Sequence, residues 1–462
     1  MKLIYNVDDK PKFGQTLLFA LQQLLAILAA TIAVPAIIGN GMSQSAALFG
    51  AGVGTIVYLL FTRFKSPVFL GSSFAFIGSM LAAFAGGVSM QLGYLGLIIG
   101  AAFAGLVYVV IAIIVKFAGV KWIAKLMPAV VIGPTVAIIG LSLAGNAIGD
   151  LTKGNVTHDV VSKALNEADE IVEVTSQVQN ASPYICLVCG LVTLFVVVLC
   201  SVYGKKMAKM IPFIIGIAAG YAVAAIFTVI GNSANIPALQ IINFSGFSSM
   251  KWIPEFTIVE AVRGFKEITP SYIATIAVAY IPVAFVVFAE HIADHKNLSS
   301  IIERDLLEEP GLHRTLLGDG IGSFAGAVFG GCPNTTYGES VGCVAISGNA
   351  SVVTILATAV FAIIAAFVAP FTTFLATIPS CVMGGVCMTL YGFIAVSGLK
   401  MLQPVDLGDN RNLFTASVIL IAGIGGLTLS FGKVTITSVA CALILGIVTN
   451  LILKGKSDKA EG

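Results

Sequence analysis

The chain has 462 residues, of which 57% are hydrophobic and only 10% are charged, with a formal net charge of +2. Soluble domains carry about 25% charged residues, so this composition excludes an ordinary soluble protein and indicates an all-α polytopic membrane protein. The near-zero net charge gives no sign of a nucleic-acid partner, and we expect none.

Apolar runs near the length of a bilayer span recur along most of the chain. The polar start, Met1–Lys12, precedes a long apolar run, so we expect no cleavable signal and a first run that stays as a span. We predict fourteen transmembrane segments, over residues 14–38, 43–61, 67–84, 92–116, 121–146, 183–203, 210–231, 271–293, 311–330, 333–347, 351–377, 380–399, 412–431 and 434–453.

The third and tenth segments are the weakest of the fourteen. Residues 333–347 are too short and too polar for a full span, and Pro333 and Gly338 favour a break in the helix. We therefore predict a short extended stretch followed by a half-helix in the tenth segment, and a matching arrangement in the third. Broken helices of this kind build substrate sites in secondary transporters.

The charges of the connecting segments predict the orientation. With the N-terminus in the cytoplasm and fourteen crossings, both termini are cytoplasmic, and the outer segments hold only a small minority of the 25 Lys and Arg residues: Lys153, Lys163, Lys251, Arg263, Lys266 and Lys433. This asymmetry follows the positive-inside rule.

Two of the predicted outer loops are long. Residues 147–182 are acidic and partly amphipathic, and residues 232–270 contain Phe256, Val259, Val262 and Phe265 at helical spacing. We expect a solvated connection in the first loop and a helix lying on the surface in the second.

A weak internal repeat relates the two halves. Residues 72–76 read SSFAF and residues 335–339 read TTYGE, while Pro128 and Gly133 match Pro379 and Gly384 in spacing. Because seven spans is an odd number, the second half enters from the opposite side, which gives a 7+7 inverted repeat. Segments 3 and 10 are then expected to face each other near the midplane, each presenting the N-terminus of a half-helix.

A glycine every fourth residue marks one face of the ninth segment, at Gly318, Gly322, Gly326 and Gly330. We interpret this face as a site of close helix packing. Asp319 lies beside it, and we prefer a role in bracing the broken tenth segment to direct contact with substrate.

Two carboxylates, Glu290 and Glu339, lie inside apolar sequence, where an ionisable group is costly unless it faces a cavity. Glu290 and Asp294 share a face of the eighth segment, and Glu339 lies in the tenth. No Lys or Arg occurs in a nearby span to pair with Glu290, which favours a functional role over a structural ion pair. A site with two carboxylates and no fixed cation suits a cation, or a neutral ligand with several N–H donors. His291 lies on another face of the helix, and we interpret it as structural.

Other classes of protein fit less well. An anion carrier of similar architecture would not place Glu339 at a half-helix N-terminus, and a channel would need a continuous polar path. An intramembrane enzyme would need a nucleophile–base pair or clustered metal ligands. We predict a carrier that is not an enzyme, with no metal site and no cofactor other than a coupling proton.

Residues 333–339 (PNTTYGE), 71–76 (GSSFAF), 289–291 (AEH) and 310–314 (PGLHR) together resemble the signature of the nucleobase–ascorbate transporter family, most closely its bacterial uracil permeases. The resemblance runs from about Pro11 to Lys454. It implies a multi-pass protein of the bacterial cytoplasmic membrane. It also implies a core domain from residues 13–118 and 271–377, a gate domain from residues 121–232 and 378–455, and a homodimer formed through the gate domains.

The resemblance further implies uracil import by proton symport, with the core moving against the gate in alternating access. The residues expected to bind substrate are Glu290, Glu339, Phe74, Gly338, Tyr337, Tyr391 and Ser73. Glu290, Asp294 and His295 are expected to couple the proton, and Asp319, Ser340 and Thr336 to support the site.

The chain departs from the family pattern at Ser340, where Asn is usual, and at Ser347, where Thr is usual. Glu339 favours uracil, whereas Asp294 and Asp319 favour purines slightly. A proton-coupled xanthine or purine permease therefore remains the alternative.

Overall fold

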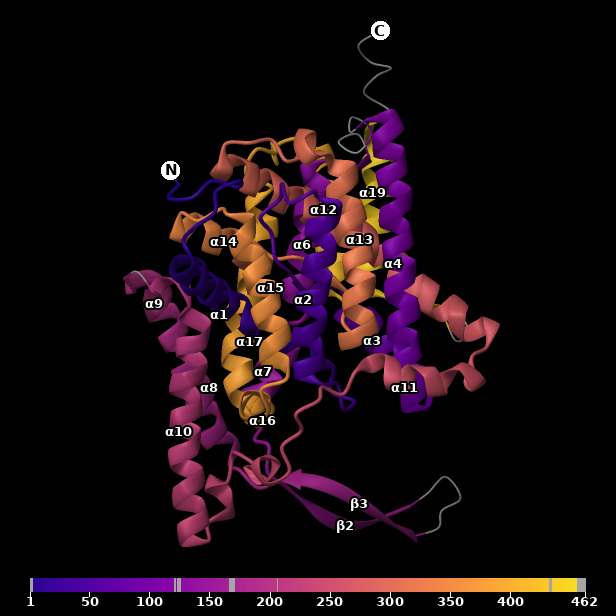
Figure 1. Cartoon of the computed structure of the whole chain (residues 1–462). Helices are drawn as coiled ribbons and strands as arrows, with labels where there is room; N and C mark the ends of the chain where they lie inside the picture. The colour runs from indigo at the N-terminus through magenta and orange to yellow at the C-terminus, as the bar shows by residue number, and fades with distance from the viewer. Residues whose placement is uncertain are drawn as a thin grey trace. The chain divides into compact units, whose positions relative to one another are not determined.

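The computed structural model describes residues 3–119, 122, 126–165, 171–205, 207–431 and 434–454, and these are mostly helical (Figure 1). The three sheets within the described residues have two strands each, so none of them closes into a barrel.

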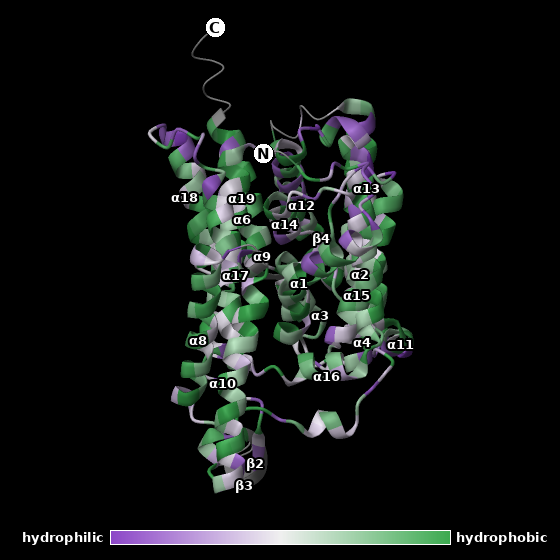
Figure 2. Cartoon of the chain, turned by 60° about the vertical axis from the view of Figure 1, so that its left-hand side comes forward, coloured by the Kyte–Doolittle hydropathy of each residue, from purple (hydrophilic) through white to green (hydrophobic). Residues whose placement is uncertain are grey.

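Eight helical stretches of the described chain are long and apolar enough to cross a membrane. They are α1 (Phe13–Ile38), α2 (Gln44–Phe61), α4 (Met90–Ala118), α6 with α7 (Ala129–Ser142 and Ala144–Asp150), α8 (Pro183–Tyr203), α10 (Pro212–Ala234), α12 (Pro270–Ile302) and α17 (Ser380–Lys400). A ninth is added if α15 (Val352–Ala366) and α16 (Ala369–Thr377) form one broken span. Figure 2 shows hydrophobic residues along most of the length of these helices.

The prediction of a helical membrane protein with several spans is confirmed, since the described residues are mostly helical. The number fourteen stays a prediction. Every predicted segment contains helix, but several helices are too short or too polar to count as spans by themselves. These are α3 (Ile77–Ala83), α13 (Leu312–Gly330), α14 (Gly338–Ser347), α18 (Asn410–Ile424) and α19 (Ser438–Lys454). The remaining elements are short: α9 (Met207–Met210), α11 (Thr257–Gly264), η1 (Phe74–Phe76), η2 (Pro237–Leu239), η3 (Ser245–Ser248), η4 (Phe265–Glu267), η5 (Leu307–Gly311), β5 (Leu429–Phe431) and β6 (Val434–Ile436).

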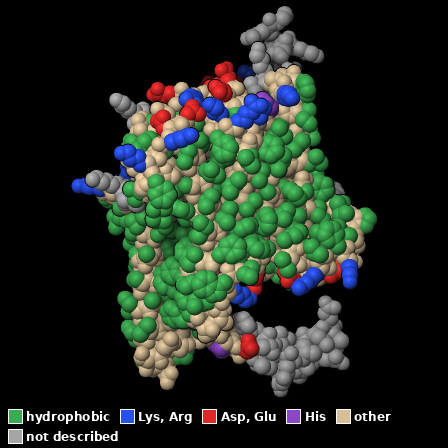
Figure 3. Space-filling model, in the orientation of Figure 1, with side chains coloured by type: hydrophobic (Ala, Val, Ile, Leu, Met, Phe, Trp, Pro, Cys, Tyr) green, Lys and Arg blue, Asp and Glu red, His purple; other side chains and the backbone are tan. Residues whose placement is uncertain are grey.

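The chain divides into two compact units. The first comprises Met1–Leu143, Trp252–Val368 and Leu390–Gly462, and the second Ala144–Lys251 and Ala369–Thr389. On the first unit, hydrophobic side chains cover the middle of the face in Figure 3, and charged side chains gather at its upper edge. On α4, for example, Leu106 and Phe117 are 57% and 81% exposed, as expected for side chains that face lipid.

The first unit contains two buried three-residue strands, β1 (Leu70–Ser72) and β4 (Asn334–Thr336), whose pairing forms the β1–β4 crossing. They pair antiparallel, with Gly71 opposite Thr335. Strand β1 leads into η1 and α3, and β4 leads into α14. The extended stretches predicted in segments 3 and 10 are therefore present, and each is followed by a helix.

The helices α13 and α2 pack closely against each other next to this crossing. A Cβ atom added to Gly322 would lie 2.7 Å from the carbonyl oxygen of Gly54, and one added to Gly330 would lie 2.6 Å from the Cα atom of Ala47. No side chain fits at either position. The interpretation of the glycine face as a packing surface is confirmed.

The two long connecting loops differ from each other. In residues 232–270, α11 forms as predicted and leaves Val259, Val262 and Phe265 more than half exposed. In residues 147–182 the structure has a hairpin of β2 (Thr157–Leu165) and β3 (Ile171–Gln179). The sequence predicts only a solvated connection there and does not reveal this hairpin.

Candidate functional site

The candidate site lies where α12 meets the two half-helices that leave the β1–β4 crossing. The helix α14 starts at Gly338, and its N-cap residue Tyr337 makes no capping bond with its side chain. The first N–H groups of a helix have no partner within the helix, and they carry the positive end of its dipole. Gly338, the first residue of this helix, is exposed to solvent.

Three carboxylates surround this helix start. Glu290 and Asp294 come from α12, Glu339 comes from the first turn of α14, and all three are half-buried. Asp294 and Glu339 lie close enough to act electrostatically on Glu290. Thr336 donates a hydrogen bond to Asp294 Oδ2 at 2.8 Å, and a Cβ atom on Gly338 would lie 3.9 Å from Asp294 Oδ1. The structure thus brings these predicted site residues together.

No Lys or Arg compensates this charge within the described part of the chain. The ion pairs found there involve Asp8, Asp150, Glu260, Asp319 and Asp409, but neither Glu290 nor Glu339. Carboxylates without a cationic partner inside a membrane protein mark a substrate or proton site.

Two aromatic residues predicted to bind substrate pack against each other. Phe74 and Tyr391 meet edge to face, with ring centroids 5.7 Å apart, and both are nearly fully buried. Tyr337 is placed differently. Its ring packs where Gly71 leaves room, and its hydroxyl donates to the carbonyl oxygen of Ser72 at 2.8 Å. Tyr337 therefore fixes the strand crossing.

Ser73 and Ser340 have contrasting surroundings. The N–H group of Ser73 donates to the Pro333 carbonyl at 2.9 Å, while its buried hydroxyl has no hydrogen-bond partner among the described residues. Ser340 Oγ accepts bonds from Gln23 Nε2 at 2.6 Å and from the Phe69 N–H at 3.1 Å. Ser340 thus ties α14 to α1 and to the start of β1.

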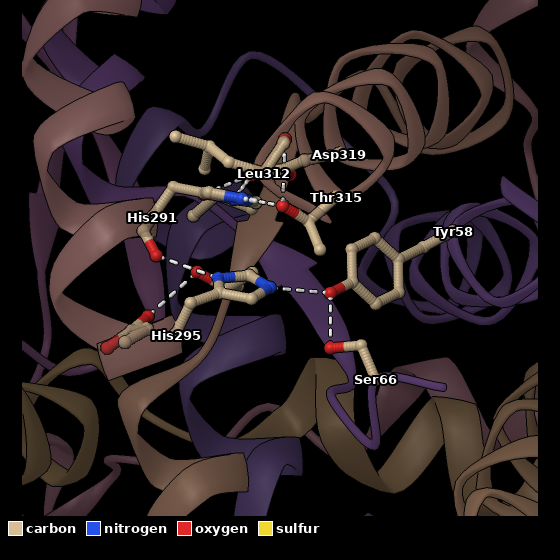
Figure 4. A network of polar contacts seen from close by, with 10 residues as sticks. Tyr58, Ser66, His291, His295, Leu312, Thr315 and Asp319 are labelled. Atoms are coloured by element: carbon tan, nitrogen blue, oxygen red, sulfur yellow. Dashed lines mark hydrogen bonds and ion pairs between the residues drawn. The ribbon is translucent and has the colours of Figure 1, made fainter. Parts of the chain in front are cut away.

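Asp319 is buried against His291, whose Nδ1 lies 2.7 Å from Asp319 Oδ2 (Figure 4). Thr335 lies 3.5 Å from the same oxygen. His295 Nε2 lies 2.7 Å from the Tyr58 hydroxyl. The structure places Asp319 where it braces β4 and α12.

Sequence reasoning missed Gln23, Tyr58 and Thr315, which hold the predicted residues in place. Gln23 left a signal, because a Gln pair inside the apolar first segment is costly without partners. Tyr58 and Thr315 left none, since hydroxyl residues are ordinary in membrane helices.

Comparisons with known proteins agree with this architecture. Residues 14–431 match the profile of the Permease family. The uracil permease of Bacillus caldolyticus is 38% identical, over 100% of this chain and 97% of that protein. The uracil permease of Bacillus subtilis is 36% identical, over 100% and 98%, and that of Escherichia coli K12 is 32% identical, over 97% and 94%.

Two solved transporters share the fold. The transmembrane domain of a cyanobacterium bicarbonate transporter, BicA, matches with a TM-score of 0.59 at 14% identity, over 96% of this chain and 98% of that one. The murine anion transporter Slc26a9 matches with a TM-score of 0.61 at 14% identity, over 96% and 69%. The full-length sequence matches decide the family: this multi-pass membrane protein is a permease of the nucleobase–ascorbate transporter family and not an enzyme.

Proposed function

We propose that the chain imports uracil across the bacterial cytoplasmic membrane by proton symport. The observation that carries the proposal is the pair Glu290 and Glu339, half-buried, within electrostatic reach of each other and without a Lys or Arg ion partner in the described chain. The uracil permeases of Bacillus caldolyticus and Bacillus subtilis match this chain over 97% and 98% of their own length.

The chemistry of uracil suits this site. Uracil is a neutral planar ring with alternating N–H donors and C=O acceptors. Glu290 and Glu339 supply acceptors for the ring N–H groups, and the backbone N–H groups of Phe74 and Gly338 supply donors for its carbonyl oxygens. Phe74 and Tyr391 meet edge to face beside the site and cover the ring. A base that leaves one buried polar group unpaired loses about 1–3 kcal/mol, so this pattern selects uracil over isosteres.

The proton follows from charge balance. An uncompensated carboxylate is costly to carry through the low-dielectric middle of the membrane. In the proposal, Glu290 takes up a proton with the substrate and exchanges it with the cytoplasm through Asp294. The loaded, neutral site then crosses, and the empty charged site does not. The third residue expected in this path, His295, contacts Tyr58 and the His291 carbonyl instead.

We further propose the fourteen-span, 7+7 inverted repeat, with both termini in the cytoplasm. The antiparallel pairing of β1 with β4, each leading into a helix, supports a twofold relation between segments 3 and 10. The division into core and gate domains, alternating access between them and a homodimer through the gate domains belong to the same proposal. The likeness to solved transporters supports the fold alone.

The test is uptake of radiolabelled uracil by the purified protein in liposomes, with unlabelled bases as competitors, and with and without a proton uncoupler. We expect uracil to compete best and the uncoupler to abolish accumulation. Indifference to uracil with strong competition by xanthine would favour the purine alternative. The Glu290→Gln variant should lose accumulation driven by a pH gradient, and the coupling scheme is wrong if that accumulation stays at the wild-type level.

A further inference from the structure

A buried polar cluster lies behind the carboxylates, and the proposed function does not use it. It consists of Ser66, Tyr58, His295, His291, Thr315 and Asp319, each with no exposed surface (Figure 4). The cluster joins α2, the loop before β1, α12 and α13. The two imidazole rings are stacked, with centroids 4.0 Å apart.

The hydrogen bonds of His295 fix its protonation pattern. Its Nδ1 lies 2.7 Å from the carbonyl oxygen of His291, and a carbonyl can only accept, so Nδ1 carries a hydrogen. Its Nε2 lies 2.7 Å from the Tyr58 hydroxyl, which is also 2.7 Å from Ser66 Oγ. A proton that reached His295 from Tyr58 would stop at a backbone carbonyl, because that oxygen has no proton to pass on.

The part of the cluster formed by His291, Thr315 and Asp319 also offers no path for a proton. Thr315 donates its hydroxyl hydrogen to the Leu312 carbonyl at 3.0 Å. Its oxygen, 3.0 Å from His291 Nε2, must therefore accept from that nitrogen. Only one proton then remains for the contact between His291 Nδ1 and Asp319 Oδ2. Whichever of the two holds it, the pair has zero net charge.

The cluster links one face of α12 to α2 and α13 through hydrogen bonds of His295 and His291. A helix turns about 100° per residue, so fixing His291 and His295 against α2 and α13 also fixes the directions of Glu290 and Asp294. Asp294 accordingly reaches Thr336 and the start of α14.

On the basis of the proposed function, we propose that four residues act as positioning residues: Tyr58, His291, His295 and Asp319. They hold α12 so that Glu290 and Asp294 face the substrate, and they pass no proton between the site and the cytoplasm. His295 then takes no part in proton coupling and affects transport only by holding Glu290 and Asp294 in place.

The experiment uses the full chain in liposomes and measures KM and kcat for uracil, together with protons moved per uracil. Tyr58→Phe removes only the hydroxyl and should raise KM about fivefold or more, with protons per uracil unchanged. The matched control is Tyr272→Phe, which removes a buried hydroxyl from α12 itself, bonded to the carbonyls of Ala83 and Leu92 outside the cluster. It should leave KM unchanged.

Two substitutions of His295 separate positioning from proton transfer. Asn can still donate to the His291 carbonyl but loses the contact with Tyr58, so His295→Asn should raise KM less than His295→Leu, which loses both contacts and should raise it about fivefold or more. The proposal is overturned if His295→Asn is as defective as His295→Leu, or if Tyr58→Phe lowers the number of protons per uracil.

Thermal stability of the purified variants gives a readout that needs no substrate. His295→Leu should melt at a lower temperature than His295→Asn, and equal melting temperatures contradict the positioning role. A wild-type protein that takes up no nucleobase would overturn the proposed function and leave this comparison valid.

Discussion

Replacing Ser340 by Ala should loosen the half-helix that carries Glu339. The hydroxyl oxygen accepts bonds from two buried donors, the Phe69 N–H at 3.1 Å and Gln23 Nε2 at 2.6 Å. Gln23 keeps a longer contact, 3.4 Å, to the Ser340 carbonyl, so the Phe69 N–H is the group left without a partner. One buried donor without a partner costs about 1–3 kcal/mol.

The assay is unfolding of the purified protein in mixed micelles, followed by circular dichroism. The matched control is Ser142→Ala, an exposed helical position whose hydroxyl bonds only to the carbonyl of its own turn, at Ile139. We expect Ser340→Ala to lose about 1–3 kcal/mol of unfolding free energy relative to this control, and to raise KM for uracil because α14 is held less firmly. Equal stability of the two variants would refute the reasoning.

Two further predictions concern packing and pH. Gly322→Leu should abolish folded protein, because even a Cβ atom there would lie 2.7 Å from the Gly54 carbonyl; recovery of a monodisperse, active protein would contradict this. The Arg304 guanidinium, 2.8 Å from Asp8, and Lys65 nearby hold the pKa of Asp8 below its ordinary value. The stability that this contact adds, at most about 1 kcal/mol for an exposed pair, is present above the ordinary Asp pKa and is lost as pH falls through the lowered one. Asp8→Asn should remove that part of the acid dependence of the melting temperature, and Arg304→Gln should remove the larger share of it, because Lys65 remains 3.2 Å from Asp8; additive effects of the two would contradict direct pairing.

The sequence determined the features that depend on local composition. Because polar groups are costly in lipid, membrane-spanning segments are apolar and can be recognised in the sequence. The same cost, with Pro333 and Gly338, predicts the extended stretch and half-helix at 333–347, which appear as β4 and α14. The four-residue spacing of glycines predicts a packing face, because a periodic pattern of small side chains needs no knowledge of its partner. The two carboxylates stand out for the same local reason, since no Lys or Arg lies between Lys266 and Glu290, or between Arg314 and Lys400 on either side of Glu339.

Only the tertiary structure decided which residues meet. Gln23 and Ser340 are 317 positions apart, and His291 meets Asp319 and Thr315 across two helices. Such contacts depend on strand register and helix rotation, which hydropathy does not encode. The β2–β3 hairpin was missed for a related reason: its cross-strand pairing is invisible in a polar loop. The sequence thus identifies the charged residues of the site, and only the tertiary structure shows which neighbours they meet, as Asp294 meets Thr336.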